Sequence, residues 1–130
     1  MHDFITGIQQ IGIGVRNLKQ STHLYKDIFG LDVLIFDDTS DAHLMTKYTG
    51  DNIYNRHAVL TMNLAGGGGV EIWQYNNREP KEKTTKIKYG DIGIYAAKIK
   101  CRDVHQAHAI LSSKKNIIVS PIITDSKNTH

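Results

Sequence analysis

Residues 8–20 read IQQIGIGVRNLKQ and contain the junction between an expected strand and an expected helix. Over residues 10–15, isoleucine and valine alternate with glutamine and glycine, which is the period of a half-buried strand. Asn17 is a typical helix N-cap, and Gln20 stands at the third helical position, as in a capping box. The stretch therefore predicts a strand that is followed at once by a helix.

The residues that follow complete one unit of the order strand, helix, strand, strand, strand. Gly30 fits the left-handed stop of the helix. Residues 37–55 are polar and without clear periodicity, as in a long loop, and the glycines of residues 66–69 are expected to form a hairpin turn. The three strands after the helix are expected at residues 31–36, 57–64 and 70–75.

The same signals begin again in the last third of the chain. Asp103 repeats the N-cap, with Gln106 three residues later, and residues 104–111 carry a second helical stripe. Residues 92–101 and 117–123 have the character of strands. This internal duplication predicts a first module at about residues 5–77, a connector at 78–90 and a partial second module at 91–130, within one domain.

Composition places the chain among ordinary globular proteins. It has 130 residues, of which 40% are apolar and 22% charged. Cys101 is the single cysteine, which excludes an internal disulfide framework and a cysteine-based zinc site. We expect a cytoplasmic protein without membrane contact, since no apolar stretch has the length of a span and no signal peptide is visible.

The net charge of +3 is unevenly distributed along the chain. Residues 1–65 contain five Lys and Arg against seven Asp and Glu, whereas residues 66–130 contain eleven against six. Many of the basic residues lie in residues 78–86, where glutamate alternates with lysine, as in a solvated connector. We therefore expect no nucleic-acid partner.

The chain resembles the vicinal oxygen chelate superfamily, which includes glyoxalase I, bleomycin-resistance proteins, fosfomycin-resistance enzymes and extradiol dioxygenases. The resemblance covers residues 8–33, extends through Gly69-Val70-Glu71-Ile72 and resumes at residues 103–111. In the first segment it rests on Gln10 in a strand, Asn17-Leu18, Ser21, Leu24-Tyr25 and Phe29-Gly30-Leu31.

This resemblance implies an α+β fold of paired βαβββ modules curled around a cavity, with the second module incomplete. Enzymes of the superfamily hold a divalent metal there, which chelates two adjacent oxygens and stabilises negative charge as a Lewis acid. Oxygen and imidazole ligands suit Zn, Ni, Mn, Fe, Co or Mg.

By the same resemblance, Gln10 and Glu71 fall at metal-ligand positions of the first module, and Glu71 is the candidate catalytic residue. Alternation places Glu71 on one strand face with Trp73 and Tyr75, so that Gln10 and Glu71 can point into one cavity. The two aromatic residues are candidate walls of a ligand pocket. Alternatively, Gln10 is satisfied within the sheet, Glu71 is a solvated carboxylate or a lysine partner, and the aromatics are half-buried sheet residues.

The second module departs from the family pattern. Its ligand position falls on Ala96, which cannot bind a metal, or on Asp91 in a register that needs extra residues. The Ala96 register directs Lys98 and Lys100 toward the cavity, where they could receive an anionic substrate or simply be exposed. His57 begins a strand, where it could act as a general base beside Glu71 or be exposed.

Two functions follow from these residues. The first is a glyoxalase-like metal-dependent lyase, isomerase or dioxygenase on a small vicinal-oxygen substrate. The second is a non-catalytic small-molecule-binding protein of the bleomycin-resistance type, and a structural or regulatory dimer is a third possibility. Because the second module stops early, either the reading frame is truncated or a second chain completes the sheet, and we expect a homodimer.

Overall fold

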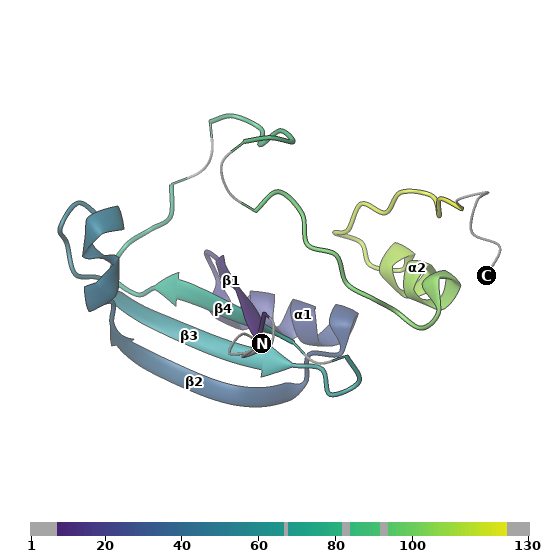
Figure 1. The fold of residues 1–130 in the computed structure, drawn as a ribbon, viewed down its shortest axis with the longest axis horizontal. Helices are drawn as coiled ribbons and strands as arrows, with labels where there is room; N and C mark the ends of the chain where they lie inside the picture. Colours follow the sequence, from purple (N-terminus) through teal and green to yellow (C-terminus); the bar gives the residue numbers. More distant parts are fainter. Residues whose placement is uncertain (1–7, 67, 82–83, 92–93, 125–130) are drawn as a thin grey trace, which may run out of the picture. The chain divides into compact units, whose positions relative to one another are not determined.

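The computed structural model describes residues 8–66, 68–81, 84–91 and 94–124 (Figure 1). The chain forms two compact units, residues 1–86 and residues 87–130. Each unit is described by itself. None of the helices among the described residues combines the length and apolar character needed to cross a bilayer.

The first unit has the expected order of one strand, one helix and three strands. Its elements are β1 (Gln10–Gly14), α1 (Leu18–Phe29), β2 (Val33–Asp41), a 3-10 helix η1 (His43–Tyr48), β3 (Asn55–Met62) and β4 (Gly69–Tyr75). The prediction of a long loop at residues 37–55 was wrong. Strand β2 continues to Asp41 because its polar second half pairs with β3 at the sheet edge, where exposed polar side chains are tolerated.

The four strands form one sheet in the order β1-β4-β3-β2 (Figure 1). Strand β1 runs parallel to β4, and the other two pairings are antiparallel. The register of β2 against β3 shifts between Leu34 and Phe36, as at a β-bulge. Strands β1 and β2 are the two edges of the sheet.

Helix α1 begins and ends as the sequence predicts. The Asn17 Oδ1 atom accepts a hydrogen bond of 2.9 Å from the Gln20 backbone N–H. At the other end, Gly30 adopts a φ of 61° and donates its N–H to the Lys26 carbonyl. Such a left-handed cap favours glycine because it lacks a Cβ atom.

One face of the sheet packs against α1 and forms the core of the first unit. Leu18 of the helix, Val59 of β3 and Ile72 of β4 are buried together there. The Leu18 N–H also donates to the Gln74 Oε1 atom at 2.7 Å, which ties the start of α1 to β4. We call this side of the sheet the α1 face and the other side the Glu71 face, because alternation separates Glu71 from Ile72.

In the second unit, α2 (Val104–Ser112) is the regular element among the described residues. Its cap is as predicted, since the Asp103 Oδ1 atom accepts from the Gln106 N–H at 2.9 Å. The predicted strands at residues 92–101 and 117–123 were wrong for the described residues 94–101 and 117–123, which form no ladder. Extended segments without a pairing strand do not make a stable sheet.

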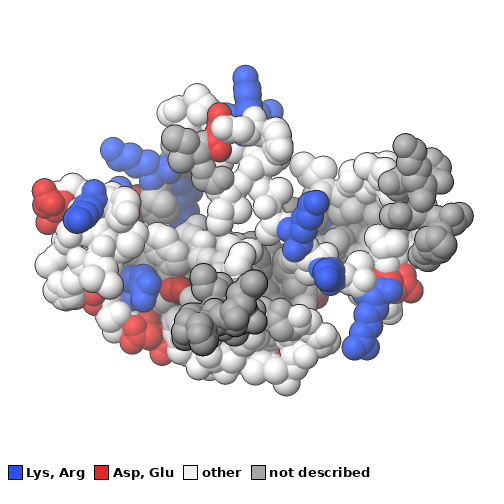
Figure 2. Space-filling view, in the orientation of Figure 1, with Lys and Arg blue, Asp and Glu red and all other residues white. Residues whose placement is uncertain are grey.

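Charged side chains are interspersed on the face shown in Figure 2. Lys and Arg stand apart from one another there, with Asp or Glu beside several of them. Cys101, in the second unit, is exposed.

Candidate functional site

The structure brings Gln10 and Glu71 into contact on one face of the sheet. Strands β1 and β4 are parallel neighbours, with Gln10 beside Gly69 and Gly12 beside Glu71. The Gln10 Nε2 atom donates a hydrogen bond of 2.5 Å to the Glu71 Oε2 atom. The two side chains therefore lie together on one face, as expected, while a cavity shared by them and their role as metal ligands remain predictions.

Arg56 completes this cluster, and sequence reasoning did not single it out. Its Nη1 atom lies 3.1 Å from the Glu71 Oε1 atom, as a hydrogen-bonded ion pair. Arg56 pairs with Tyr75 in the register of β3 and β4, and the small Ala58 lies between Arg56 and Leu60, the partner of Glu71. The signal was present in the sequence, because alternation along β3 places Arg56 on the same face as Ala58 and Leu60.

The ion pair between Arg56 and Glu71 is partly withdrawn from solvent. The side chain of Glu71 is 14% exposed and that of Arg56 is 33% exposed. Each carboxylate oxygen of Glu71 thus accepts from a protein donor, one from a neutral amide and the other from a guanidinium. Hydrogen bonds to a charged group are among the stronger ones in proteins, so the cluster fixes the carboxylate in place.

Trp73 lies over a part of β1 that carries no side chains on this face. A Cβ atom added to Gly14 would stand 3.0 Å from the Trp73 Cζ2 atom, and one added to Gly12 would stand 3.8 Å from its Nε1 atom. The two glycines of the opening motif therefore make room for the indole ring. They leave it as a flat, half-buried surface beside the Glu71 cluster.

The aromatic surface continues from Trp73 along the end of β4. The Trp73 and Tyr75 rings meet edge to face with centroids 5.2 Å apart, and Tyr54 lies 5.2 Å from Tyr75. The guanidinium of Arg78 stacks over both tyrosines, with its Cζ atom 5.0 Å from the Tyr54 centroid and 5.9 Å from the Tyr75 centroid. These cation–π contacts hold Arg78 against the two tyrosine rings.

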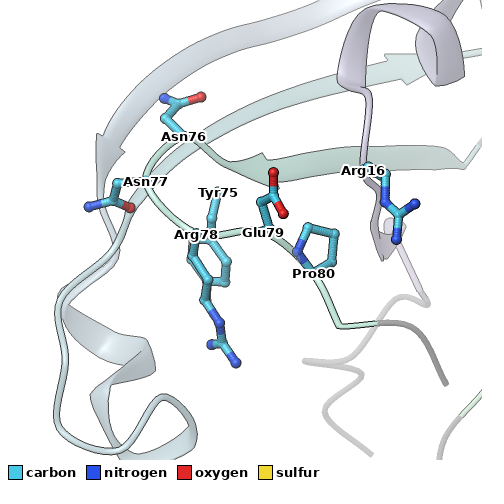
Figure 3. Close-up of a pocket in the computed structure, with 7 residues that line it drawn as sticks. All are labelled: Arg16, Tyr75, Asn76, Asn77, Arg78, Glu79 and Pro80. Carbon is cyan, nitrogen blue, oxygen red and sulfur yellow. The ribbon is translucent and has the colours of Figure 1, made fainter. Parts of the chain in front are cut away.

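Beside these rings lies a hollow of about 470 Å³ (Figure 3). Arg16, which follows β1, stands on one side of it, and Tyr75 and Arg78 stand on the other, with Glu79 and Pro80 between them. The hollow is therefore lined mainly by polar and charged groups, in contrast to the surface of Trp73.

His57 does not share the face of Glu71, which corrects the expectation of a general base there. In the register of β3 and β4 it pairs with Gln74, so it lies on the α1 face. Its Nε2 atom contacts the Asp37 Oδ1 atom at 2.6 Å. The alternation of β3 places residue 57 on the opposite side from Ala58, Leu60 and Arg56.

Lys98 and Lys100 lie in the second unit, in an exposed stretch without strand structure. The alternation that would have directed both toward a cavity requires a strand, which the described residues 94–101 do not form. The choice between Ala96 and Asp91 as the ligand position likewise depends on a strand register that is absent there. The candidate site therefore lies within the first unit.

The donor set around Glu71 does not fit the divalent metal that the fold family implies. A metal would have to replace the Gln10 amide or lie within reach of the Arg56 guanidinium, whose positive charge repels a cation. Gln10 and Glu71 are also only two ligands, fewer than a tightly held metal needs. Among the residues that the structure describes, no three His, Cys, Asp or Glu side chains gather to hold a metal ion.

Comparison with known proteins gives the fold. No protein-family profile matches the sequence, and no curated protein matches it. The structure is similar to the crystal structure of a glyoxalase family protein from Bacillus cereus, with a TM-score of 0.62 and 11% sequence identity. The match covers 83% of this chain and 71% of the other. The chain therefore has the glyoxalase-like α+β fold, with a partial second module, as the resemblance in sequence led us to expect.

Proposed function

We propose that this chain is a small-molecule-binding protein of the bleomycin-resistance type, which acts without a metal. The observation that carries the proposal is the state of Glu71, whose two carboxylate oxygens are engaged by Gln10 and Arg56. A carboxylate held in this way is a polar wall of a binding site and is poorly available as a metal ligand.

The ligand proposed for this face is a planar aromatic or conjugated molecule. Trp73 offers a flat ring over the glycine positions of β1, and Tyr75 continues the aromatic surface. Aromatic rings bury large areas and favour offset or edge contacts with other rings. Gln10 and Arg56 add hydrogen-bond donors that can orient a polar substituent of the ligand.

A metal-dependent lyase, isomerase or dioxygenase is the second candidate function. It is favoured by the contact between Gln10 and Glu71, which occupy the ligand positions suggested by the family resemblance. This function requires Arg56 to withdraw from Glu71 before a cation enters.

The tryptophan itself provides the test of the proposed function. Trp73 is the only tryptophan in the chain, so its indole N–H gives one resonance in a ¹H–¹⁵N spectrum. We expect saturable shifts of this resonance when a library of planar heteroaromatic fragments is titrated in the presence of EDTA. Shifts that appear only after addition of Zn²⁺ or Mg²⁺ would overturn metal-independent binding and support the enzyme.

A pair of matched variants locates the site. Arg56→Met removes a donor of the Glu71 cluster and is expected to weaken fragments that carry an acceptor group by about ten- to a hundredfold, the value of one hydrogen bond to a charged group. Lys47→Met removes a positive charge at an exposed residue of η1, an element that contributes no residue to the cluster, and is expected to leave affinity unchanged. Equal losses in both variants would place the ligand elsewhere.

We also propose that the chain forms a homodimer. The proposal is supported by the edge strands β1 and β2 and by exposed apolar residues of the second unit, including Ile99 and Ile118. Unpaired edges and exposed apolar groups favour association. Size-exclusion chromatography with light scattering at micromolar concentration is expected to give twice the mass of the chain, and a monomer would contradict the proposal.

A further inference from the structure

A groove of about 1120 Å³ lies on the α1 face, between α1 and β2. Its lining residues all belong to the first unit. Val59 and Thr61 of β3 form part of its floor. In the register of β3 and β4, both lie on the face of the sheet opposite to Glu71 and Trp73. The groove is therefore separated from the Glu71 face by the thickness of the sheet.

The wall formed by α1 is basic. Lys19, His23 and Lys26 line the groove at helical positions i, i+4 and i+7, which lie on one side of a helix. Both lysines are exposed, and neither forms an ion pair within the part of the chain that the structure describes. His23 lies 3.6 Å from Asp27 on the same helix.

The acidic residues that line the groove form no ion pair with these lysines within the part of the chain that the structure describes. Asp37 of β2 is engaged by His57, whose Nε2 atom lies 2.6 Å from the carboxylate. Asp32 is the other acidic residue that lines the groove. Positive charge is thus concentrated on the helical wall of the groove, where it is complementary to an anion.

The groove also offers apolar surface and one unused hydroxyl. Leu18 and Val59 are nearly fully buried beneath it, while Leu34 on the β2 side is 59% exposed. Thr61 is 6% exposed, and its Oγ1 atom has no hydrogen-bond partner among the described residues. A buried hydroxyl without a partner is uncommon in folded proteins, and this one lies below the surface of the groove floor.

We propose that this groove binds a small aliphatic carboxylate. The acyl chain lies along Leu34 and Val59, and the carboxylate lies against Lys19 and Lys26, whose side chains are long enough to converge from two turns of the helix. This ligand differs from the planar one proposed for the Glu71 face, so the two sites are independent.

Octanoate is the probe for the test, with 1-octanol as its uncharged counterpart. In ¹H–¹⁵N spectra of the full chain, octanoate is expected to shift backbone amides of residues 18–26 and 57–61 while leaving the Trp73 indole resonance in place. Octanol is expected to bind at the same amides at least fivefold more weakly, because it lacks the charge that the lysines attract.

Two double variants of equal charge separate the groove from general electrostatics. Lys19→Gln with Lys26→Gln removes the basic wall at exposed positions and is expected to weaken octanoate by about fivefold, the effect of losing exposed ion pairs. It is expected to leave octanol binding unchanged. Lys47→Gln with Lys81→Gln removes two exposed charges outside the groove and is expected to leave octanoate affinity unchanged.

Three results would overturn the proposal. The first is a loss of octanoate affinity that is equal in the two double variants. The second is an octanoate-induced shift confined to the Trp73 indole, or no shift at millimolar octanoate. The third is a shift of the backbone amides of the groove with protein concentration but not with octanoate. Such a result would identify the groove as an interface between copies of the chain.

Discussion

Arg56 decides the chemistry of Glu71 and so provides the sharpest test at the scale of single residues. Arg56→Met leaves the Glu71 carboxylate, whose side chain is 14% exposed, with Gln10 as its remaining donor. We therefore expect the free energy of unfolding to fall by about 1–2 kcal/mol. Adding Glu71→Gln removes the unpaired charge and is expected to recover at least half of that loss. Urea denaturation of the two single variants and the double variant measures the coupling.

The matched control for this cycle is Lys47→Met, at an exposed position of η1, which is expected to change stability very little. Losses that simply add in the double variant would contradict an energetic link between Arg56 and Glu71.

Gly14 is predicted to be essential for the position of Trp73. Gly14→Val places a Cβ atom 3.0 Å from the indole Cζ2 atom and adds further methyl groups, so the ring must move. We expect a red-shifted emission maximum of Trp73 and a loss of about 1–3 kcal/mol of stability from overpacking. Gly66→Ala is the control, because a Cβ atom there meets nothing within 4 Å. Unchanged emission in Gly14→Val would contradict the proposed packing.

Alternation along single strands could be predicted from the sequence, and contacts between strands could not. The grouping of Glu71 with Trp73 and Tyr75 follows from the period of β4 alone. The same rule applied to β3 separates His57 from Arg56, but it does not say which of the two shares a face with Glu71. The contact of Arg56 with Glu71 depends on the register of two strands, which hydrophobic pattern alone does not encode.

At the scale of elements, the two helix caps are alike in geometry and are expected to differ in their effect on stability. In both, an Oδ1 atom accepts a backbone N–H at 2.9 Å, from Asn17 in α1 and from Asp103 in α2. Asn17→Ala is expected to cost about 1 kcal/mol because α1 packs into the core through the buried Leu18. Asp103→Ala is the matched control, since α2 has no buried residue.

Chemical denaturation followed by Trp73 emission measures this difference, because Trp73 reports on the first unit. The midpoint is expected to fall in Asn17→Ala and to stay in place in Asp103→Ala. A shift of equal size in both variants would show that the stability of the first unit depends on the second helix.

Elements with local signals were predictable, and those defined by a distant partner were not. The caps at Asn17 and Asp103 and the stop at Gly30 are encoded within a few residues of each helix end. The second half of β2 was missed because its polar residues pair at a sheet edge and leave no apolar pattern. Residues 117–123 have an apolar pattern without a partner strand, so they were wrongly predicted to form a strand.

At the scale of the whole molecule, the resemblance to the vicinal oxygen chelate superfamily, together with the repeat of strand and helix signals, predicted the glyoxalase-like fold with a partial second module. The structure confirms this fold, although sequence identity to the matching structure is only 11%. The metal site that the resemblance implies is a different matter, because the resemblance places candidate ligand positions in both modules. Gln10 and Glu71 supply two positions, while the second unit provides no strand ligand among its described residues.

The central claim is that Arg56 and Gln10 occupy Glu71 in place of a metal. Elemental analysis tests it most directly, on protein prepared without chelator or metal-affinity resin and then dialysed against Mn²⁺, Co²⁺, Ni²⁺ or Zn²⁺. We predict far less than one metal ion per chain in the unmodified protein. One metal ion per chain that is lost in Glu71→Ala would contradict the account.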